Sequence, residues 1–311
     1  IYTSGTSGEP KGVMLKHEAL LRQKAAIEEF FHFGADEHSL CFLPLSHALE
    51  RAWTTVVLLK GCMNTYVSNP REIADQMVLA RATLMVSVPK LYETVYATAH
   101  AKVASSAVKR RIFQWALCVG SRNQQCYQKG KKPPWWWRAQ LPLADKLVHA
   151  NIREAIGGSK KVLACGGAPL RVEVEEFFSA IGQPIYTGYG LTEASPLVSF
   201  NSPAGFKAGT VGKVMPGSRV EISDGDEICY RGPNIMAGYW RDQVATDEVI
   251  VDGWLHTGDI GYLDEDGFLV VTDRLKDIIV TLGGKNVAPQ PVESLILADP
   301  LFEHAVLLGD R

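Results

Sequence analysis

The first twelve residues, Ile1-Tyr-Thr-Ser-Gly-Thr-Ser-Gly-Glu-Pro-Lys-Gly12, combine side chains that could hold a phosphate group. Glycine amides and Ser or Thr hydroxyls can wrap around phosphate oxygens, and Lys11 adds a mobile positive charge. The Walker A pattern cannot be aligned with this stretch. Taken alone, a loop rich in Ser, Thr and Gly is more often a solvated turn. The phosphate-loop interpretation therefore depends on the rest of the chain.

A second stretch whose side chains could take part in binding or catalysis is Tyr186-Thr-Gly-Tyr-Gly-Leu-Thr-Glu193. An aromatic ring can stack on a purine, Thr192 can hydrogen-bond a phosphate, and the Glu193 carboxylate can hold a hard cation such as Mg²⁺. The Gly-x-Gly pattern lacks the third glycine of the dinucleotide-binding fingerprint, which excludes that interpretation. A single Glu in such a loop is usually a surface residue or a helix cap, and both alternatives stay open here.

The elements that must position these residues alternate between strands and helices. Apolar residues spaced at helical intervals predict a helix over 13–33, directly after the phosphate-loop candidate, which is the order that phosphate binding prefers. The alternation predicts a layered α/β domain. Strands are expected over 39–46, 63–67, 83–88, 161–165 and from 184, and helices over 50–59, 73–80 and from 170 to 178.

Beyond Gly205 the pattern changes to short β runs broken by Gly, Pro and Asp. These runs predict a small, mostly antiparallel unit. The expected strands are 210–212, 218–223, 227–230 and 268–271, and a new strand-and-helix unit starts with 278–282 and 291–297.

Composition excludes several classes of protein. The chain has 311 residues, 46% of them hydrophobic and 21% charged, with a net charge of −2, which favours a globular protein without a general affinity for nucleic acid. No run of apolar residues is long enough for a membrane-spanning helix. Its six cysteines form no C-x-x-C pair. We expect reduced thiols in a cytoplasmic protein and no zinc site.

The segment between Glu93 and Asp145 carries many basic residues and no acidic one, and 129–138 reads Lys-Gly-Lys-Lys-Pro-Pro-Trp-Trp-Trp-Arg. Clustered tryptophans beside cations suit the headgroup boundary of a membrane. A solvated helical hairpin whose Pro-Pro-Trp-Trp-Trp turn packs against the body explains the same residues. Nucleic acid is the least favoured partner. The expected location is therefore cytoplasmic, with peripheral membrane contact through 129–138 as the alternative.

Five segments resemble, in the same order, the signatures of the acyl-adenylate-forming enzymes, which include acyl-CoA synthetases, luciferases and the adenylation domains of peptide synthetases. Besides the two stretches above, they are Gly166-Gly-Ala-Pro-Leu170, Trp254-Leu-His-Thr-Gly-Asp-Ile-Gly261 and Asp273-Arg-Leu-Lys-Asp277. Within this superfamily, Phe42-Leu-Pro-Leu-Ser-His47 and the long basic insert look most like long-chain fatty acyl-CoA synthetases.

The resemblance implies roles for individual residues. Thr192, Glu193 and His47 would be catalytic, with Glu193 holding Mg²⁺ and His47 near the acyl carboxylate. Asp259 would take the ribose hydroxyls, and Lys276 would be the pivot between a large and a small domain. The positions implied around ATP are Thr3, Ser4, Gly5, Thr6, Ser7, Gly8, Lys11, Gly166, Ala168, Pro169, Tyr186, Gly188, Tyr189, Gly190, Asp259, Arg274 and Lys276.

The implied activity has two half-reactions. A fatty acid carboxylate attacks the α-phosphorus of ATP to give acyl-AMP and pyrophosphate, and the thiol of coenzyme A then displaces AMP. Trp53, Val56, Val57 and Leu58 could line an acyl tunnel or form the buried face of a helix. The alternatives are a fatty acyl-AMP ligase or another acyl- or aryl-adenylating enzyme, and a non-catalytic membrane-associated scaffold that kept the fold.

The same resemblance predicts the domain organisation. Residues 1–205 would form the α/β part of the large domain, 206–272 a β-rich subdomain, 273–277 a hinge and 278–311 the start of a smaller α+β C-terminal domain. The chain is expected to be an internal fragment whose adenylating lysine lies beyond Arg311. As a fragment it is expected to adenylate poorly.

Overall fold

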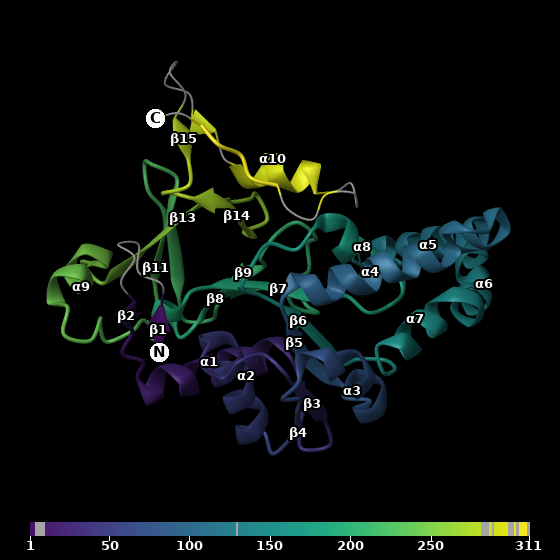
Figure 1. Cartoon of the computed structure of the whole chain (residues 1–311), viewed down its shortest axis with the longest axis horizontal. Helices are drawn as coiled ribbons and strands as arrows, with labels where there is room; N and C mark the ends of the chain where they lie inside the picture. The colour runs from purple at the N-terminus through teal and green to yellow at the C-terminus, as the bar shows by residue number, and fades with distance from the viewer. Residues whose placement is uncertain are drawn as a thin grey trace.

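The computed structural model describes residues 1–3, 10–128, 130–280, 286–287, 289–297, 302 and 305–309. A seven-stranded sheet forms the centre of the large part of the molecule (Figure 1). In spatial order, the first five strands run parallel to one another, and each of the last two is antiparallel to the strand before it. In spatial order they are β4 (Met63–Tyr66), β3 (His38–Cys41), β5 (Leu84–Ser87), β6 (Val162–Cys165), β7 (Ile185–Gly190), β8 (Leu197–Phe200) and β9 (Lys213–Val214).

Helices cover both faces of this sheet because successive strand residues point to opposite sides. Leu163 of β6 packs in one apolar cluster, whereas its neighbours Val162 and Ala164 pack in the other. The second cluster also contains residues of α1 (His17–Phe30) and α2 (Ala48–Leu59). The first contains residues of α3 (Ile73–Ala80), α4 (Pro89–Ala104), α5 (Ala107–Gln128), α6 (Trp135–Ala144), α7 (Ala150–Ala155) and α8 (Val172–Ala180).

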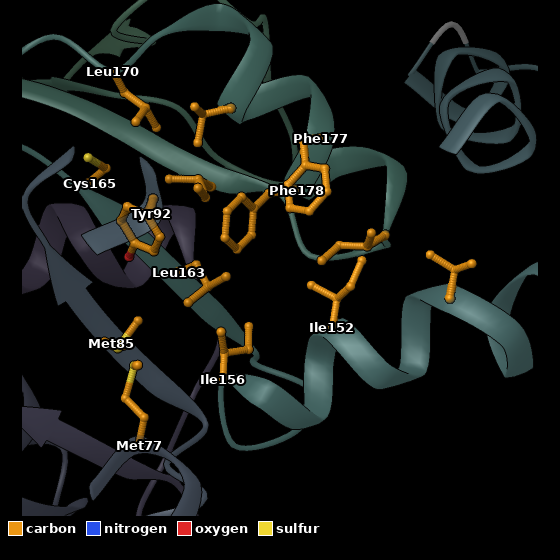
Figure 2. Packing of buried hydrophobic residues seen from close by; sticks show 14 of the residues in the cluster. Met77, Met85, Tyr92, Ile152, Ile156, Leu163, Cys165, Leu170, Phe177 and Phe178 are labelled. Atoms are coloured by element: carbon orange, nitrogen blue, oxygen red, sulfur yellow. The ribbon is translucent and has the colours of Figure 1, made fainter. Parts of the chain in front are cut away.

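In the larger cluster Tyr92, Phe177 and Phe178 lie among aliphatic and sulfur-containing side chains (Figure 2). Tyr92 of α4 and Phe178 of α8 meet edge to face with ring centroids 5.5 Å apart. The buried Tyr92 hydroxyl donates to the Ala164 carbonyl at 2.8 Å, so its polar end is satisfied under the sheet. This packing fixes α4 and α8 against the strands whose ends carry the candidate site.

A second, antiparallel sheet follows. It contains β10 (Arg219–Ile222), β11 (Glu227–Arg231), β12 (Ile250–Val251), β13 (Trp254–Leu263) and β14 (Leu269–Arg274), with α9 (Gln243–Val249) beside it. The chain ends with β15 (Ile279–Val280), β16 (Asn286–Val287) and α10 (Pro289–Ile296). Short pieces complete the order: β1 (Tyr2–Thr3), β2 (Lys11–Gly12), η1 (Pro70–Glu72), η2 (Asp145–His149) and η3 (Thr192–Ala194).

The layered α/β class and the small antiparallel unit were predicted correctly. The helix over 73–80 has the predicted bounds. The first helix begins at His17 and not at Val13, because Val13 and Met14 pair with the segment around Tyr239. The strand expected over 210–212 is wrong: the nearby strand is β9, which belongs to the large sheet although it follows Gly205. Residues 254–263, expected only as a motif, form the long strand β13.

The basic segment contains most of α4 and the packed helices α5 and α6, and α5 and α6 extend away from the sheet (Figure 1). The helical hairpin expected there is present as α5 and α6. Pro133 is buried in its turn, Trp137 packs against the larger apolar cluster, and Pro134 caps α6, which starts at Trp135. The Trp135 and Trp136 side chains are 74% and 52% exposed, so they do not pack against the body. Among the described residues, no helix combines the length and the apolar character needed to cross a bilayer.

Candidate functional site

The candidate site lies where the parallel strands end. β3, β5, β6 and β7 run in the same direction, so the segments that follow them meet at one edge of the sheet. In open α/β sheets this carboxyl edge is the usual position of a ligand. Gly166 follows β6 and is buried, whereas Ala168 and Pro169 in the same loop are exposed. The exposed part of the loop can therefore face a bound molecule.

The phosphate-loop candidate begins and ends in a short hairpin. Thr3 of β1 and Lys11 of β2 are register partners, so the two ends of the loop are held together. The predicted phosphate-binding residues Ser4, Gly5, Thr6, Ser7 and Gly8 lie outside the described residues.

Residues 238–240, which are distant in the sequence, hold this hairpin in place. The Trp240 N–H donates to the Gly12 carbonyl at 2.7 Å, and the Met14 N–H donates to the Gly238 carbonyl at 3.0 Å. These backbone bonds extend the pairing of β2 without depending on side chains. They place Lys11 beside residues that come more than two hundred positions later in the sequence.

Lys11, Tyr239 and Glu193 form one contiguous group. The Lys11 Nζ lies 5.0 Å from the centroid of the Tyr239 ring, a cation–π contact. The Tyr239 hydroxyl donates to Glu193 Oε1 at 2.8 Å. Burial, and secondarily the charge of Glu193, raises the pKa of Tyr239, so the phenol stays protonated and keeps donating. The group joins the end of the phosphate-loop candidate to the predicted metal ligand.

The loop that carries Glu193 is fixed by buried amides. The Met236 N–H donates to the Glu193 carbonyl at 2.8 Å. The side-chain amides of Gln23 and Asn234 each donate to the Leu197 carbonyl at 2.9 Å, just beyond the loop. These partners come from α1 and from the segment before Tyr239, so the backbone of the loop that carries Glu193 is held by two separate parts of the chain.

Asp259, Tyr189 and Arg274 form a second group. The Tyr189 hydroxyl donates to Asp259 Oδ2 at 2.6 Å. Arg274 Nε lies 3.5 Å from Asp259 Oδ1, and the two residues are register partners on β13 and β14. Burial raises the pKa of Asp259, while the bond from Tyr189 and the charge of Arg274 act in the opposite direction. The Asp259 side chain is 13% exposed and that of Arg274 is 70% exposed, so the cation can reach a ligand.

The predicted hinge starts directly at this group. The Leu275 N–H donates to the Gly258 carbonyl at 2.8 Å, which extends the β13–β14 pairing by one bond. Lys276 is exposed, and its side chain has no partner among the described residues. The buried Asp273 accepts from the Gln290 N–H at 3.2 Å, so the end of β14 is tied to α10.

The glycines of β7 are required by close packing. A Cβ on Gly190 would overlap the Pro196 carbonyl oxygen, and one on Gly188 would overlap the Phe200 ring. Tyr186 on the same strand is buried, with its ring 5.1 Å from that of Phe31. Tyr186 therefore belongs to an apolar core cluster, whereas the Tyr189 hydroxyl reaches Asp259 in the candidate site.

A narrow apolar pocket lies beneath Gly166 and Gly188. Its volume is about 40 Å³, and its walls include Leu49, Trp53, Val86, Ala164 and Phe200. Trp53, one of the residues expected to line an acyl tunnel, does line this pocket. The other three do not: Val56 and Val57 are buried in the core below α2, and Leu58 is 55% exposed.

His47 and Thr192 lie at the carboxyl edge without side-chain partners among the described residues. His47 is the exposed residue before α2, whose N–H donates to the Pro44 carbonyl at 2.9 Å. Thr192 is half-buried and opens η3, directly before Glu193. Tyr239 is the functional residue that sequence reasoning missed. Its only signal is its place in the Gly238-Tyr-Trp240 run, which by itself indicates no chemistry.

The layered α/β fold and the two groups at its carboxyl edge can be compared with known proteins. Residues 1–240 match the family model described as AMP-binding enzyme. The chain therefore belongs to the AMP-binding enzyme family. It is 39% identical over 312 residues to "Long-chain-fatty-acid--CoA ligase FadD15" of Mycobacterium tuberculosis, with 100% of this chain and 52% of that protein covered.

Solved structures share the fold. ATP-bound MatB from Rhodopseudomonas palustris has a TM-score of 0.70 at 26% identity, over 96% of this chain and 52% of that one. The O-succinylbenzoate coenzyme A synthetase MenE of Bacillus subtilis, in complex with ATP and magnesium, has a TM-score of 0.73 at 24% identity, over 100% of this chain and 57% of that one. The chain thus spans about half the length of the relatives that it matches.

Proposed function

We propose that the protein containing this chain is a long-chain fatty acid–CoA ligase that works through an acyl-adenylate. The observation that carries the proposal is the meeting of Lys11, Glu193 and Tyr239 beside the carboxyl edge of the sheet. The identity with a relative named as a long-chain fatty acid–CoA ligase supports the acyl class.

The residues present fit ATP. The Asp259 carboxylate can accept from both hydroxyls of a ribose, while Tyr189 and Arg274 hold it in place. The exposed Arg274 guanidinium supplies charge for ribose or phosphate oxygens. Lys11 and the Thr3 hydroxyl stand at the two ends of the loop proposed to wrap the departing pyrophosphate.

The donor set also fits Mg²⁺. Glu193 Oε2 takes part in no hydrogen bond or ion pair within the described ranges, and the Thr192 hydroxyl is next to it in sequence. Carboxylate and hydroxyl oxygens suit a hard cation. When bound, Mg²⁺ would neutralise charge on the phosphates. The task of this chain is to present Glu193 in one orientation, which the Tyr239 hydroxyl and the Met236 amide secure.

The proposed chemistry needs little covalent participation from the protein. A carboxylate oxygen of the fatty acid forms a bond to the α-phosphorus as the bond to pyrophosphate breaks. The coenzyme A sulfur then bonds to the acyl carbon, the thiol proton leaves, and AMP departs. Negative charge moves onto pyrophosphate in the first step, so Lys11 and the loop amides act by position and charge. His47 is proposed to lie near the acyl carboxylate.

The apolar pocket beneath Gly166 and Gly188 is proposed to receive the acyl end. At about 40 Å³ it holds only a few water-sized groups. A long acyl chain therefore needs side chains such as Trp53 to move, or a path that continues elsewhere. An acyl group of shorter length would need no such movement.

A substrate panel tests this proposal. The intact protein is incubated with ATP, Mg²⁺, coenzyme A and fatty acids of increasing length, and AMP and thioester are both measured. The proposal expects both products in equal amounts. AMP release without thioester would indicate an acyl-AMP ligase, and preference for an aromatic acid would indicate an aryl-adenylating enzyme. Binding to liposomes with no AMP release for any acid would indicate a scaffold.

We further propose that α5 and α6 contact a membrane surface. Trp135 and Trp136 are exposed at the start of α6, and Lys131, Lys132 and Arg138 around them are exposed too. Indole rings and cations together suit an anionic headgroup region. Arg122 lies 4.4 Å from the Trp137 ring, so the third tryptophan is part of the α5–α6 packing and not of this surface.

Sedimentation with anionic and zwitterionic vesicles tests the contact. Replacing Lys131 and Lys132 together by Gln should weaken binding to anionic vesicles by about 30-fold, at about 1 kcal/mol per basic residue. W135A/W136A should weaken binding to both. Leu79→Ala, which removes another side chain that is 74% exposed, is the matched control. Equal sedimentation of all variants would refute the contact.

A further inference from the structure

Glu227, Cys229 and His256 form a cluster of ligating atoms in the small sheet. One donor atom from each side chain lies within 4.8 Å of the other two. Cys229 Sγ is 3.7 Å from His256 Nδ1, and Glu227 Oε2 is 2.9 Å from the same nitrogen. The three residues have no common spacing in the sequence, which is why the absence of a zinc site was expected. The pairing of β11 with β13 brings them together.

The backbone fixes this arrangement. Cys229 and His256 are register partners on adjacent antiparallel strands, and Glu227 lies two residues before Cys229, on the same face of β11. The Gly258 N–H donates to Glu227 Oε1 at 2.9 Å, which holds the carboxylate so that Oε2 faces the histidine. Ligands carried on paired strands lose little freedom on binding, which favours a preformed site.

The distances suit a tetrahedral metal. Bonds of about 2.0–2.3 Å to nitrogen, oxygen and sulfur place neighbouring ligand atoms about 3.5 Å apart. The separation of 3.7 Å between Cys229 and His256 already matches. The 2.9 Å between His256 and Glu227 is a hydrogen-bond length that opens slightly when a metal replaces the shared proton. The His256 side chain is 36% exposed, so a water molecule can complete the fourth position.

The charges of the cluster also favour a cation. The Glu227 carboxylate brings negative charge to the His256 ring, which the Cys229 thiol also contacts. The nearby Arg231 guanidinium faces the Trp254 ring at 5.8 Å and not the cluster. A bound cation would supply the missing positive charge and stabilise the thiolate.

We propose that Glu227, Cys229 and His256 bind a divalent transition metal of the Zn²⁺ class, separate from the Mg²⁺ position at Glu193. A thiolate and an imidazole select a borderline-soft ion over Mg²⁺. On binding, the Cys229 thiol loses its proton to solvent. The proton shared by His256 Nδ1 and Glu227 also leaves, either to the ring's Nε2 or to solvent, so that His256 carries one ring proton, on Nε2, and coordinates through Nδ1.

Cobalt titration of the intact protein tests the site, because Co²⁺ bound to a thiolate gives a near-ultraviolet charge-transfer band that Mg²⁺ does not give. We expect this band to saturate at one Co²⁺ per chain, to disappear when one equivalent of Zn²⁺ is added and to persist in excess Mg²⁺. C229S should abolish the band. H256Q, at a half-exposed position, should weaken Zn²⁺ affinity by more than about tenfold, the lower bound for changes to the outer shell of a metal site.

Controls separate this site from other thiols. Cys118 is exposed on α5, so C118S removes an accessible thiol without touching the cluster and should leave the band unchanged. If C229S does not fold, H256Q and E227Q still test the proposal through the rise in melting temperature that Zn²⁺ gives the unaltered protein. No band at equimolar Co²⁺, a band that survives in C229S, or equal Zn²⁺ affinity in H256Q would overturn the proposal.

Discussion

The buried carboxyl group of Glu175 on α8 accepts a hydrogen bond from the backbone N–H of Gly209 at 2.7 Å. Its other oxygen accepts from the Thr187 hydroxyl on β7. Glu175 is 1% exposed, so this one buried carboxyl joins the strand of the candidate site to the connection between β8 and β9. Burial raises the pKa of Glu175 to about 7, which outweighs the opposing effect of these two bonds.

This carboxyl predicts a fall of stability between about pH 4.5 and 7. In that range the unfolded chain has already lost the proton while the folded chain keeps it, so raising the pH favours unfolding. Glu175→Gln removes the titration. Relative to the unaltered protein, we expect the variant to gain up to about 3 kcal/mol between pH 5 and pH 8. Urea unfolding at several pH values measures this. Glu176 is exposed on the same helix, so Glu176→Gln should show the same dependence of the free energy of unfolding on pH as the unaltered protein.

Glu193→Gln should lower kcat/KM for acyl-adenylate formation by on the order of 100-fold, because the amide cannot offer a metal ion a negative oxygen. The loss should appear as AMP release at fixed fatty acid and ATP, and excess Mg²⁺ should restore it only in part. Glu173→Gln on the exposed side of α8 serves as the matched control. A Glu193→Gln enzyme with unchanged kcat/KM would rule out this role.

Tyr239→Phe tests whether Tyr239 positions Glu193. The variant keeps the ring over which Lys11 lies but removes the donor to the carboxylate, a bond worth about 1.5–3 kcal/mol when one partner is charged. We expect at least a tenfold rise in the Mg²⁺ concentration needed for half-maximal adenylation. Tyr262→Phe, at a 51% exposed position on β13, is the control. Identical Mg²⁺ curves would show that the bond does not matter for function.

Asp259→Asn should raise KM for ATP by on the order of tenfold with a smaller effect on kcat. An amide can accept through one atom only, and its NH₂ group would face either Tyr189 or Arg274. Asp224→Asn, at an exposed position in the β10–β11 turn, provides the comparison. Pyrophosphate exchange at varied ATP gives both constants, and an unchanged KM would contradict the assignment of the ribose position.

Phe178→Ala should destabilise the protein by about 3–5 kcal/mol, the usual range for removing a fully buried ring. The ring packs against Tyr92 at the centre of the larger apolar cluster (Figure 2). Val172→Ala, at a 41% exposed position on α8, should change the free energy of unfolding by less than about 0.5 kcal/mol. The two variants are compared by their denaturant midpoints, provided that the slope of the free energy of unfolding against denaturant concentration is unchanged. Similar midpoints for both variants would contradict the predicted core.

Local patterns in the sequence predicted most of the large sheet and the helix over 73–80, because alternating and helical spacings are read within a few residues. They failed where tertiary context decides. No helix was predicted directly after the strand expected over 83–88, although α4 begins at Pro89, where a missing N–H costs nothing.

The candidate site was predicted only in part, for the same physical reason. Glu193 and Asp259 stand in recognisable motifs, but their partners depend on chain segments that meet only in three dimensions. The contact of Tyr239 with Glu193 spans 46 positions. The facing of Cys229 and His256 depends on the register of β11 with β13, which no local spacing encodes.

The pairing of Asp259 with Arg274 has a mechanical consequence. Both residues belong to the β13–β14 ladder, and the Leu275 N–H adds its last bond. A rotation about Lys276 therefore breaks no strand pairing. Among the described residues it interrupts the local bond from the Asp277 N–H to the Arg274 carbonyl, the tie between Asp273 and Gln290, and the bond from the Arg171 guanidinium to the Leu297 carbonyl at 3.4 Å. Each of these bonds is worth about 1 kcal/mol. Arg274 would keep its position relative to the proposed nucleotide site while the residues after Lys276 rotate.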